Sequence, residues 1–522
     1  MKNDLLAYRH IGISEKDEEK MLQKIGVKSL DELIDKTIPA NIRLKEPLAL
    51  PKTMTEYEFG QHIAGLAAKN KLYTTYIGMG WYNTITPAVI QRNVFENPAW
   101  YTSYTPYQTE VSQGRLEALL NFQTVISDLT AMPLANCSLL DEATAAAEAA
   151  TMMYGLRSRD QQKKSTNVLF VDESIFPQNL AVIQTRVIPQ GMKIQVGNYK
   201  ELEFTPEIFA CIIQYPNASG SVEDYREFVE KAHAANCKVA VDADILSLAL
   251  LLPPGEWGAD IVFGSTQRLG IPLFYGGPSA AYFATRDEYK RNMPGRIIGL
   301  SKDKYGKICY RMALQTREQH IKREKATSNI CTAQALLATM AGFYTVYHGQ
   351  EGIKNIAKRI HSIATWLNKA LARLGYVQHN EIFFDTLRFS LPDHVSAQKL
   401  RTIALSKEVN LCYYDNGDVG FSIDETTDLK DVNLLLSIFS IAAEETMQEV
   451  TDIPEASSLN RDLRRRTSFL THEVFNKYHT ETEMMRYIKR LERKDISLAH
   501  SMISLGSCTM KLNAAAEMLP LS

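Results

Sequence analysis

Six short apolar runs between residues 168 and 283 constrain the fold of this 522-residue chain more than any other feature. They alternate with helix-length stretches, and one of these, 222–235, has the periodicity of an amphipathic helix. Uninterrupted apolar runs with helices between them are typical of a mostly parallel sheet covered on both faces. The sequence therefore predicts an α/β domain with strands at 168–172, 193–196, 210–215, 238–242, 260–263 and 280–283.

The rest of the chain divides into three further parts. Residues 382–389, 409–414 and 419–423 favour strands, while 330–375 and 431–444 favour helices. Ser14 and Ser29 each precede an acidic first turn, so we expect residues 1 to about 70 to be helical. We therefore predict a helical arm (1–75), a large α/β domain (76–335), a small α+β domain (336–450), and a linker followed by a further unit (451–522).

Charge and cysteine pattern exclude several classes of function. The formal net charge is −2, so bulk charge does not favour a nucleic-acid partner. No apolar run approaches the ~20 residues of a membrane span, and the charged N-terminus has no apolar signal region. We therefore expect a cytoplasmic protein with no membrane partner. The seven cysteines form no CxxC pair, so we expect reduced thiols and no metal site.

An internal repeat relates the two ends of the chain. Four positions near the start recur 425 residues later with the same residue type, namely Glu58, Ile63, Leu66 and Lys69 as Glu483, Ile488, Leu491 and Lys494. With one extra residue, IGMG at 77–80 aligns with ISLG at 503–506. We infer that a second copy of a similar unit begins near residue 475. We expect 475–522 either to be poorly ordered or to pack on the first copy.

Three features of the α/β domain suit a phosphate-bearing aromatic cofactor. A polar turn at 139–148 opens an alanine-rich helix, whose free N–H groups favour an anion. Asp242 and Asp244 end a strand, where a carboxylate can pair with a protonated ring nitrogen, as enzymes that use pyridoxal phosphate (PLP) require. The loop 265–278 is where such an enzyme would have its Schiff-base lysine, and it contains no lysine. Each feature alone is also compatible with a capped helix or a turn.

Together these residues resemble the P-protein of the glycine cleavage system, the PLP-dependent glycine dehydrogenase (decarboxylating). The resemblance covers nearly the whole chain and is most specific in YRHIG at 8–12, YIGMG at 76–80, ALQTREQH at 313–320, ATSNICT at 326–332, YHTETEMMR at 478–486 and LGSCTMKLN at 505–513. It implies the type I PLP-enzyme (aspartate-aminotransferase-like) fold. The family has two homologous halves, fused or separate, and this chain resembles the first half with the opening of the second.

The resemblance also implies where the cofactor lysine is. In the family, a His-Lys motif before Ile-Pro in the second half forms the Schiff base. Aligning that Ile-Pro on Ile271 places Gln267 at the lysine position and Thr266 at the histidine position. A glutamine amide cannot form an imine, so we expect no catalytic residue in this chain and PLP bound through a lysine outside it. Asp242 or Asp244 is the counterpart of the acid that pairs with the pyridinium nitrogen.

The type I dimer implies further contacts across the interface between halves. The candidate contacts to the cofactor are Tyr275, Gly276, Gly277, Ser507, Cys508 and Thr509. The candidate residues of a substrate channel are Tyr104, Tyr107 and Gln108. Interface packing and turns are the structural alternative for both sets.

By resemblance, the reaction is PLP-dependent decarboxylation of glycine with transfer of the aminomethyl group to the lipoyl arm of the H-protein. The implied partners are the second half of the P-protein, the H-protein and glycine, in a homodimer or a two-half heterotetramer. Two alternatives remain open at this point. The chain is a non-catalytic scaffold that completes a partner's active site, or a Rossmann-type nucleotide binder, for which Gly78 and Gly80 are weak support.

Overall fold

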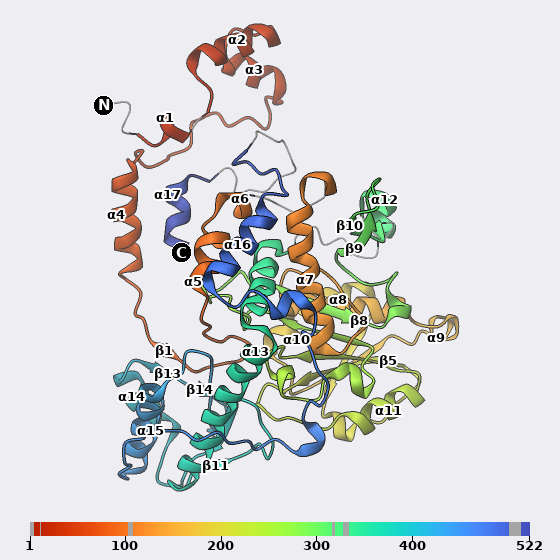
Figure 1. Ribbon diagram of the computed structural model, residues 1–522, viewed down its shortest axis with the longest axis vertical. Coiled ribbons are helices and arrows are strands. Elements are labelled where there is room, and N and C mark those ends of the chain that lie inside the picture. The colour runs from red at the N-terminus through yellow and green to blue at the C-terminus, as the bar shows by residue number, and fades with distance from the viewer. Residues whose placement is uncertain are drawn as a thin grey trace. The chain divides into compact units, whose positions relative to one another are not determined.

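The computed structural model describes residues 5–10, 12–102, 108–315, 319–326, 333–500 and 513–521 (Figure 1). They belong to two compact units, Met1–Leu72 with Leu512–Ser522, and Tyr73–Lys511. Within these ranges, no helix has the length and apolar character needed to span a bilayer.

A seven-stranded sheet forms the centre of the larger unit, in the order β2-β8-β7-β6-β5-β3-β4. Neighbours from β4 to β7 pair in parallel, whereas β8 and β2 are antiparallel to their neighbours. The strands are β2 (Leu134–Ala135), β3 (Val168–Asp172), β4 (Lys193–Gly197), β5 (Ile208–Tyr215), β6 (Lys238–Ala243), β7 (Ile261–Ser265) and β8 (Ala281–Thr285). The mostly parallel sheet predicted from the six apolar runs is confirmed.

Helices cover both faces of this sheet because successive strand residues point to opposite sides. Phe170, Ile213 and Val241 enter one core, whereas the adjacent Leu169 and Ile212 enter the other. The helices of this unit's first part are α5 (Ala88–Ile90), α6 (Pro98–Tyr101), α7 (Gln113–Thr130), α8 (Glu142–Gly155), α9 (Arg159–Lys163), α10 (Pro177–Val187) and α11 (Arg226–Ala234). The expected helix at 222–235 is confirmed, and it is shorter at both ends than predicted.

A smaller antiparallel sheet, in the order β11-β12-β15-β14, follows the long helix α13. Its neighbourhood consists of α13 (Ala335–Ala372), β11 (Val377–Gln378), β12 (Thr386–Ser390), α14 (Ala397–Ser406), β13 (Val409–Asn410), β14 (Cys412–Tyr413), β15 (Val419–Ser422) and α15 (Leu429–Ala443). The predicted strand 409–414 is two short strands, because β13 pairs with β1 (Thr74–Thr75) and β14 pairs with β15. A separate hairpin, β9 (Ile297–Lys302) with β10 (Ile308–Ala313), precedes α12 (Gln319–Lys322).

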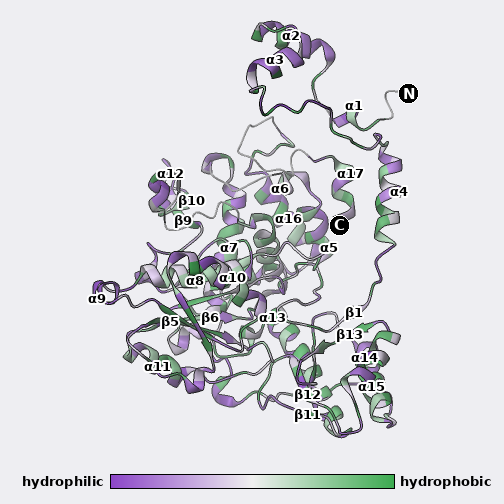
Figure 2. Cartoon of the chain, turned by 180° about the vertical axis from the view of Figure 1, so that it is seen from behind, coloured by the Kyte–Doolittle hydropathy of each residue, from purple (hydrophilic) through white to green (hydrophobic). Residues whose placement is uncertain are grey.

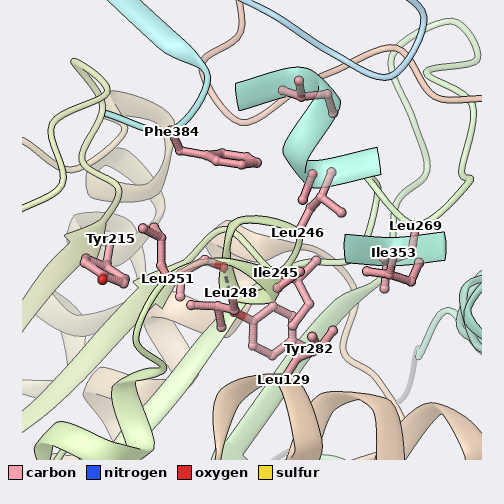
Figure 3. Packing of buried hydrophobic residues seen from close by; sticks show 14 of the residues in the cluster. Leu129, Tyr215, Ile245, Leu246, Leu248, Leu251, Leu269, Tyr282, Ile353 and Phe384 are labelled. Carbon is pink, nitrogen blue, oxygen red and sulfur yellow. Dashed lines mark hydrogen bonds between the residues drawn. The ribbon is translucent and has the colours of Figure 1, made fainter. Parts of the chain in front are cut away.

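One cluster of buried apolar side chains ties these parts together (Figure 3). The segment after β6 contributes Ile245, Leu246, Leu248 and Leu251, all at most 1% exposed. Figure 3 shows them among Leu129 of α7, Tyr282 of β8, Ile353 of α13 and Phe384, which precedes β12. The large sheet and the smaller one are therefore held by one continuous core at the carboxyl end of β6.

The smaller unit contains α1 (Ala7–His10), α2 (Glu15–Ile25), α3 (Leu30–Thr37), α4 (Glu56–Ala67) and α17 (Ala515–Met518). Ser14 and Ser29 cap α2 and α3 as predicted, each by accepting a hydrogen bond from the third amide of its helix. The expectation of helix through residues 1–70 is wrong for 38–55, where Pro39, Pro47 and Pro51 remove amide donors and prevent a helix. The four-part domain division remains a prediction.

The repeat inferred from the sequence has a structural counterpart. Thr55 begins α4 in a capping box with Glu58, and 425 residues later Thr480 begins α16 (Glu481–Glu492) in a capping box with Glu483. Both helices have 12 residues. Helix α16 packs on α7, so the described part of 475–522 in the larger unit packs on the first copy, which is one of the two expected outcomes.

Candidate functional site

A narrow pocket lies at the carboxyl ends of β6 and β7, where ligands commonly bind in open α/β sheets. Polar side chains from distant parts of the chain line it, among them Tyr82, Glu142, Asp242, Asp244, Arg268 and Asp385. Its cavity volume is about 30 Å³. Such a space holds about one or two water molecules.

Arg268 fills much of this region with a buried ion cluster. Its side chain is 4% exposed, and Nη1 donates to Asp244 Oδ2 at 2.7 Å and to Asp385 Oδ2. The guanidinium lies over the Tyr82 ring, 3.8 Å from the ring centroid. Burial alone would lower the pKa of Arg268, but the two carboxylates raise it above its usual value. Asp244 is therefore committed to Arg268.

Asp242 belongs to a second cluster of polar side chains, with Asn179 and Glu142. Its Oδ2 accepts a hydrogen bond from Asn179 Nδ2 at 2.7 Å, and the Glu142 carboxyl lies beside it. Glu142 Oε1 accepts from the Ser265 backbone N–H at 3.2 Å. Burial raises the pKa of Asp242, and the charge of Glu142 raises it further. Burial also raises the pKa of Glu142 to about 7. The two acids therefore retain a proton between them well above the pH at which exposed carboxyls ionise.

This pair makes stability depend on pH. Between pH 4.5, the ordinary pKa of glutamate, and about 7, the folded chain holds a proton that the unfolded chain releases. The free energy of unfolding should therefore fall as pH rises through this window and level off above it. In urea titrations, the decrease in the free energy of unfolding from pH 5 to pH 8 should be about 1 to 2 kcal/mol smaller for Glu142→Gln than for wild type. The exposed Glu227→Gln is the control, and equal pH profiles for wild type and Glu142→Gln would refute the assignment.

Gln267, at the predicted lysine position, is fully buried, and its side chain forms hydrogen bonds with backbone groups. Its Nε2 donates to the backbone oxygens of Tyr82 at 2.7 Å and Ile271 at 2.6 Å, and its Oε1 accepts from the Tyr82 N–H at 3.1 Å. Lysine has donors only and could not accept from Tyr82. Thr266 likewise donates to the Ala280 backbone oxygen at 2.8 Å. Both side chains are therefore used to hold neighbouring backbone segments together.

These contacts decide whether the pocket of this chain suits PLP. The imine-forming position is an amide, neither Asp242 nor Asp244 is free for a ring nitrogen, and the free space is that of about two waters. The N-terminus of α8, predicted as an anion site, is capped by Asp141, which accepts from the Thr144 N–H at 2.8 Å. The residues present do not fit the cofactor.

The other predicted site residues that the structure describes, Gln108, Tyr275, Gly276 and Gly277, do not line this pocket. Tyr275 is 76% exposed, Gly276 and Gly277 have φ of 107° and 117°, and a side chain added at Gly276 would meet no atom within 4 Å. Gln108 is exposed and precedes a single 3₁₀ turn. Tyr104, Tyr107, Ser507, Cys508 and Thr509 fall outside the described residues. The assignment of these residues to an interface or a channel stays a prediction.

Sequence reasoning misses most residues of the pocket, among them Tyr82, Glu142, Arg268 and Asp385. Glu142 lies in the polar turn 139–148, where only the backbone amides are expected to act. Arg268 directly follows Gln267, which occupies the family's lysine position. This neighbouring position is the sequence feature from which Arg268 could have been predicted as a pocket residue. Asp385 comes from the smaller sheet region, 117 residues further along the chain, and nothing in the sequence pairs the two.

Comparison with known proteins places the chain in a family. The family described as glycine cleavage system P-protein matches residues 8–439. Proteins named glycine dehydrogenase (decarboxylating) from Bacteroides fragilis and Bacteroides thetaiotaomicron are 79% and 80% identical over all 522 residues. The chain spans 55% of the length of each of them.

Solved structures agree with this placement. A glycine decarboxylase (P-protein) of the glycine cleavage system, in inhibitor-bound form, aligns with a TM-score of 0.73 at 30% identity, over 82% of this chain and 98% of that one. A sphingosine-1-phosphate lyase from Burkholderia pseudomallei shares the fold, with a TM-score of 0.54 at 13% identity over 77% and 93% of the two chains. The predicted type I PLP-enzyme fold is confirmed. On the match over residues 8–439, this chain belongs to the glycine cleavage system P-protein family.

Proposed function

We propose that the complete protein is a glycine dehydrogenase (decarboxylating), and that this chain forms its first half. The observation that supports the activity most directly is the 79–80% identity over all 522 residues to proteins of that name. The substrate is then glycine, and the aminomethyl group passes to the lipoyl arm of the H-protein. We place the protein in the cytoplasm, as a homodimer or a heterotetramer of two halves.

In this proposal PLP is bound by the second half, through a lysine outside this chain. PLP supplies the electron-withdrawing ring that stabilises the charge left when CO2 departs. The first half acts as a structural partner, for which the committed contacts of Gln267, Asp242 and Asp244 are the support. Its candidate contributions to the shared site are Tyr275, Gly276 and Gly277, with Ser507, Cys508 and Thr509 near the cofactor and Tyr104, Tyr107 and Gln108 along the channel.

The proposal is tested by adding PLP to the purified chain, reducing with borohydride and mapping the peptides. We expect no absorbance band near ~400–430 nm and no reduced lysine, because no lysine occurs in the loop 265–278. Glycine-dependent CO2 release should require the second half as well. A specific adduct on one lysine of this chain, or CO2 release without the second half, would contradict the scaffold role.

A further inference from the structure

Several apolar side chains of residues 42–70 are exposed, whereas the matching side chains in the second copy of the repeat are buried. The counterpart, 467–495, lies 425 positions further along the chain and packs into the larger unit. Its Phe469 and Phe475 are 2% and 0% exposed, whereas Leu44 and Leu50 at the matching positions are 68% and 76% exposed. The same apolar positions are thus buried in one copy and open in the other.

The two helices within these segments differ in the same way. In α16 the residues that face the core are Met484, Tyr487, Ile488 and Leu491, each at most 1% exposed. The matching residues of α4 are Phe59, His62, Ile63 and Leu66, so the apolar stripe is retained at three of the four positions. No residue of α4 is buried, and Leu66 is 45% exposed. Apolar (green) turns of α4 are visible in Figure 2.

Helix α4 is also poorly suited to stand alone. It has only 12 residues, and two of them are Gly60 and Gly65 with nothing within 4 Å of an added side chain. Short helices are marginal in water, and each interior glycine weakens a helix further. A stable α4 therefore needs an apolar surface to pack against.

The way α16 packs shows what that surface looks like. Leu491 lies so close to α7 that a side chain added at Gly114 would be 2.0 Å from its backbone oxygen. Asp495 then accepts hydrogen bonds from the N–H of Gly114 at 2.7 Å, the N–H of Arg115 at 3.1 Å and Arg115 Nε at 2.9 Å. The matching residue Asn70 has a side-chain oxygen that can accept from a helix N-terminus in the same manner.

Each unit contains one contact between an arm helix and the other copy. In the larger unit, helix α16 packs on α5 and the π-helical turn after it, Gln91–Phe95. With the one-residue insertion of the repeat, α17 is the second copy's counterpart of that region. Helix α4 packs on α17. The arm of each copy therefore contacts the same element of the other copy.

We propose that residues 42–70 dock on the second half of the protein, across its counterpart of α5 and α7, as 467–495 dock on the first half here. The partner surface is an apolar groove beside a helix whose N-terminus has a residue as small as Gly114. A second copy of this chain does not offer that groove, because its own α16 covers Gly114. The two halves thus exchange their N-terminal segments about a pseudo-twofold axis.

The test uses the full 522-residue chain, co-produced with the part of the Bacteroides fragilis relative that follows its match to Ser522. Hydrogen exchange of residues 56–67 is measured in the chain alone and in the purified complex. We expect exchange to slow at least ten-fold in the complex. Ile63→Asp with Leu66→Asp should abolish this slowing and weaken the complex at least ten-fold in sedimentation velocity.

The matched control is Gln61→Asp with Ala64→Asp, whose counterparts Arg486 and Lys489 are exposed in α16. It adds the same two charges to the same helix. The slowing of hydrogen exchange in the complex and the affinity between the two halves should both stay at wild-type values. No complex with wild type, a complex in which 56–67 exchange as fast as in the free chain, or equal effects of the two double variants would each overturn the proposal. None of these readouts depends on glycine turnover, so they stand apart from the proposed activity.

Discussion

Replacement of Arg268 by leucine is expected to lower the free energy of unfolding by about 3 to 5 kcal/mol in urea titrations, since it leaves buried carboxylates without their counter-charge. Asp385 has a side chain that is 4% exposed and Asp244 one that is 15% exposed, so neither is easily hydrated. Arg268→Lys keeps the charge but not the planar contact with Tyr82, and should give an intermediate loss.

The control for this prediction is an ion pair of similar geometry on the surface. Arg226 and Asp224 are 2.5 Å apart, with side chains 47% and 44% exposed. Arg226→Leu should cost less than about 1 kcal/mol, because water solvates both groups in its absence. Comparable losses for Arg268→Leu and Arg226→Leu would show that the pocket is hydrated and that the cluster is not a core element.

Gly114→Ala should detach α16 from α7. The new methyl group would be 2.0 Å from the Leu491 backbone oxygen, and backbone cannot yield as a flexible side chain does. We expect a loss of about 3 kcal/mol in the free energy of unfolding, at the upper end for an overpacked core. The region 480–495 should also become sensitive to limited proteolysis under conditions in which wild type is resistant.

Gly60→Ala tests whether this effect comes from packing alone. Nothing lies within 4 Å of an added side chain at Gly60, and it too is in a helix. Alanine there should stabilise α4 by about 0.5 to 1 kcal/mol through helix propensity. Resistance of 480–495 to protease in Gly114→Ala would contradict the close packing of α16.

The fold is largely predictable from the sequence because its strands are uninterrupted apolar runs of strand length. The run at Val168–Asp172 predicts the observed bounds of β3, and the other runs differ from their strands by one or two residues at the ends. The smaller sheet is harder to predict, since the strand at 409–414 divides between β15, which follows closely, and β1, which lies more than 300 positions earlier in the chain. The stretch 38–55 is predicted as helix because capping residues precede it in the chain. Its three prolines favour a non-helical backbone.

The pocket shows the limit of reasoning from a single sequence. Gln267 can be identified because it lies in a loop with a recognisable pattern, and its position can be read locally. Its partners cannot, since Tyr82 is 185 positions away and reaches it only through the tertiary fold. The same holds for Asp385, which contacts Arg268 across 117 positions. Side-chain hydrogen bonds across such separations leave no periodic trace.

The packing of α16 on α7 sets an order of events during synthesis. The N-terminal amides of α7 are satisfied by Asp495, which is 381 positions further along the chain. Contacts of such long sequence separation form late, because a long loop must close before they stabilise anything. Nascent chains that have emerged only as far as α15 therefore expose the α7 groove. The larger unit therefore completes its folding only after Asp495 has been translated.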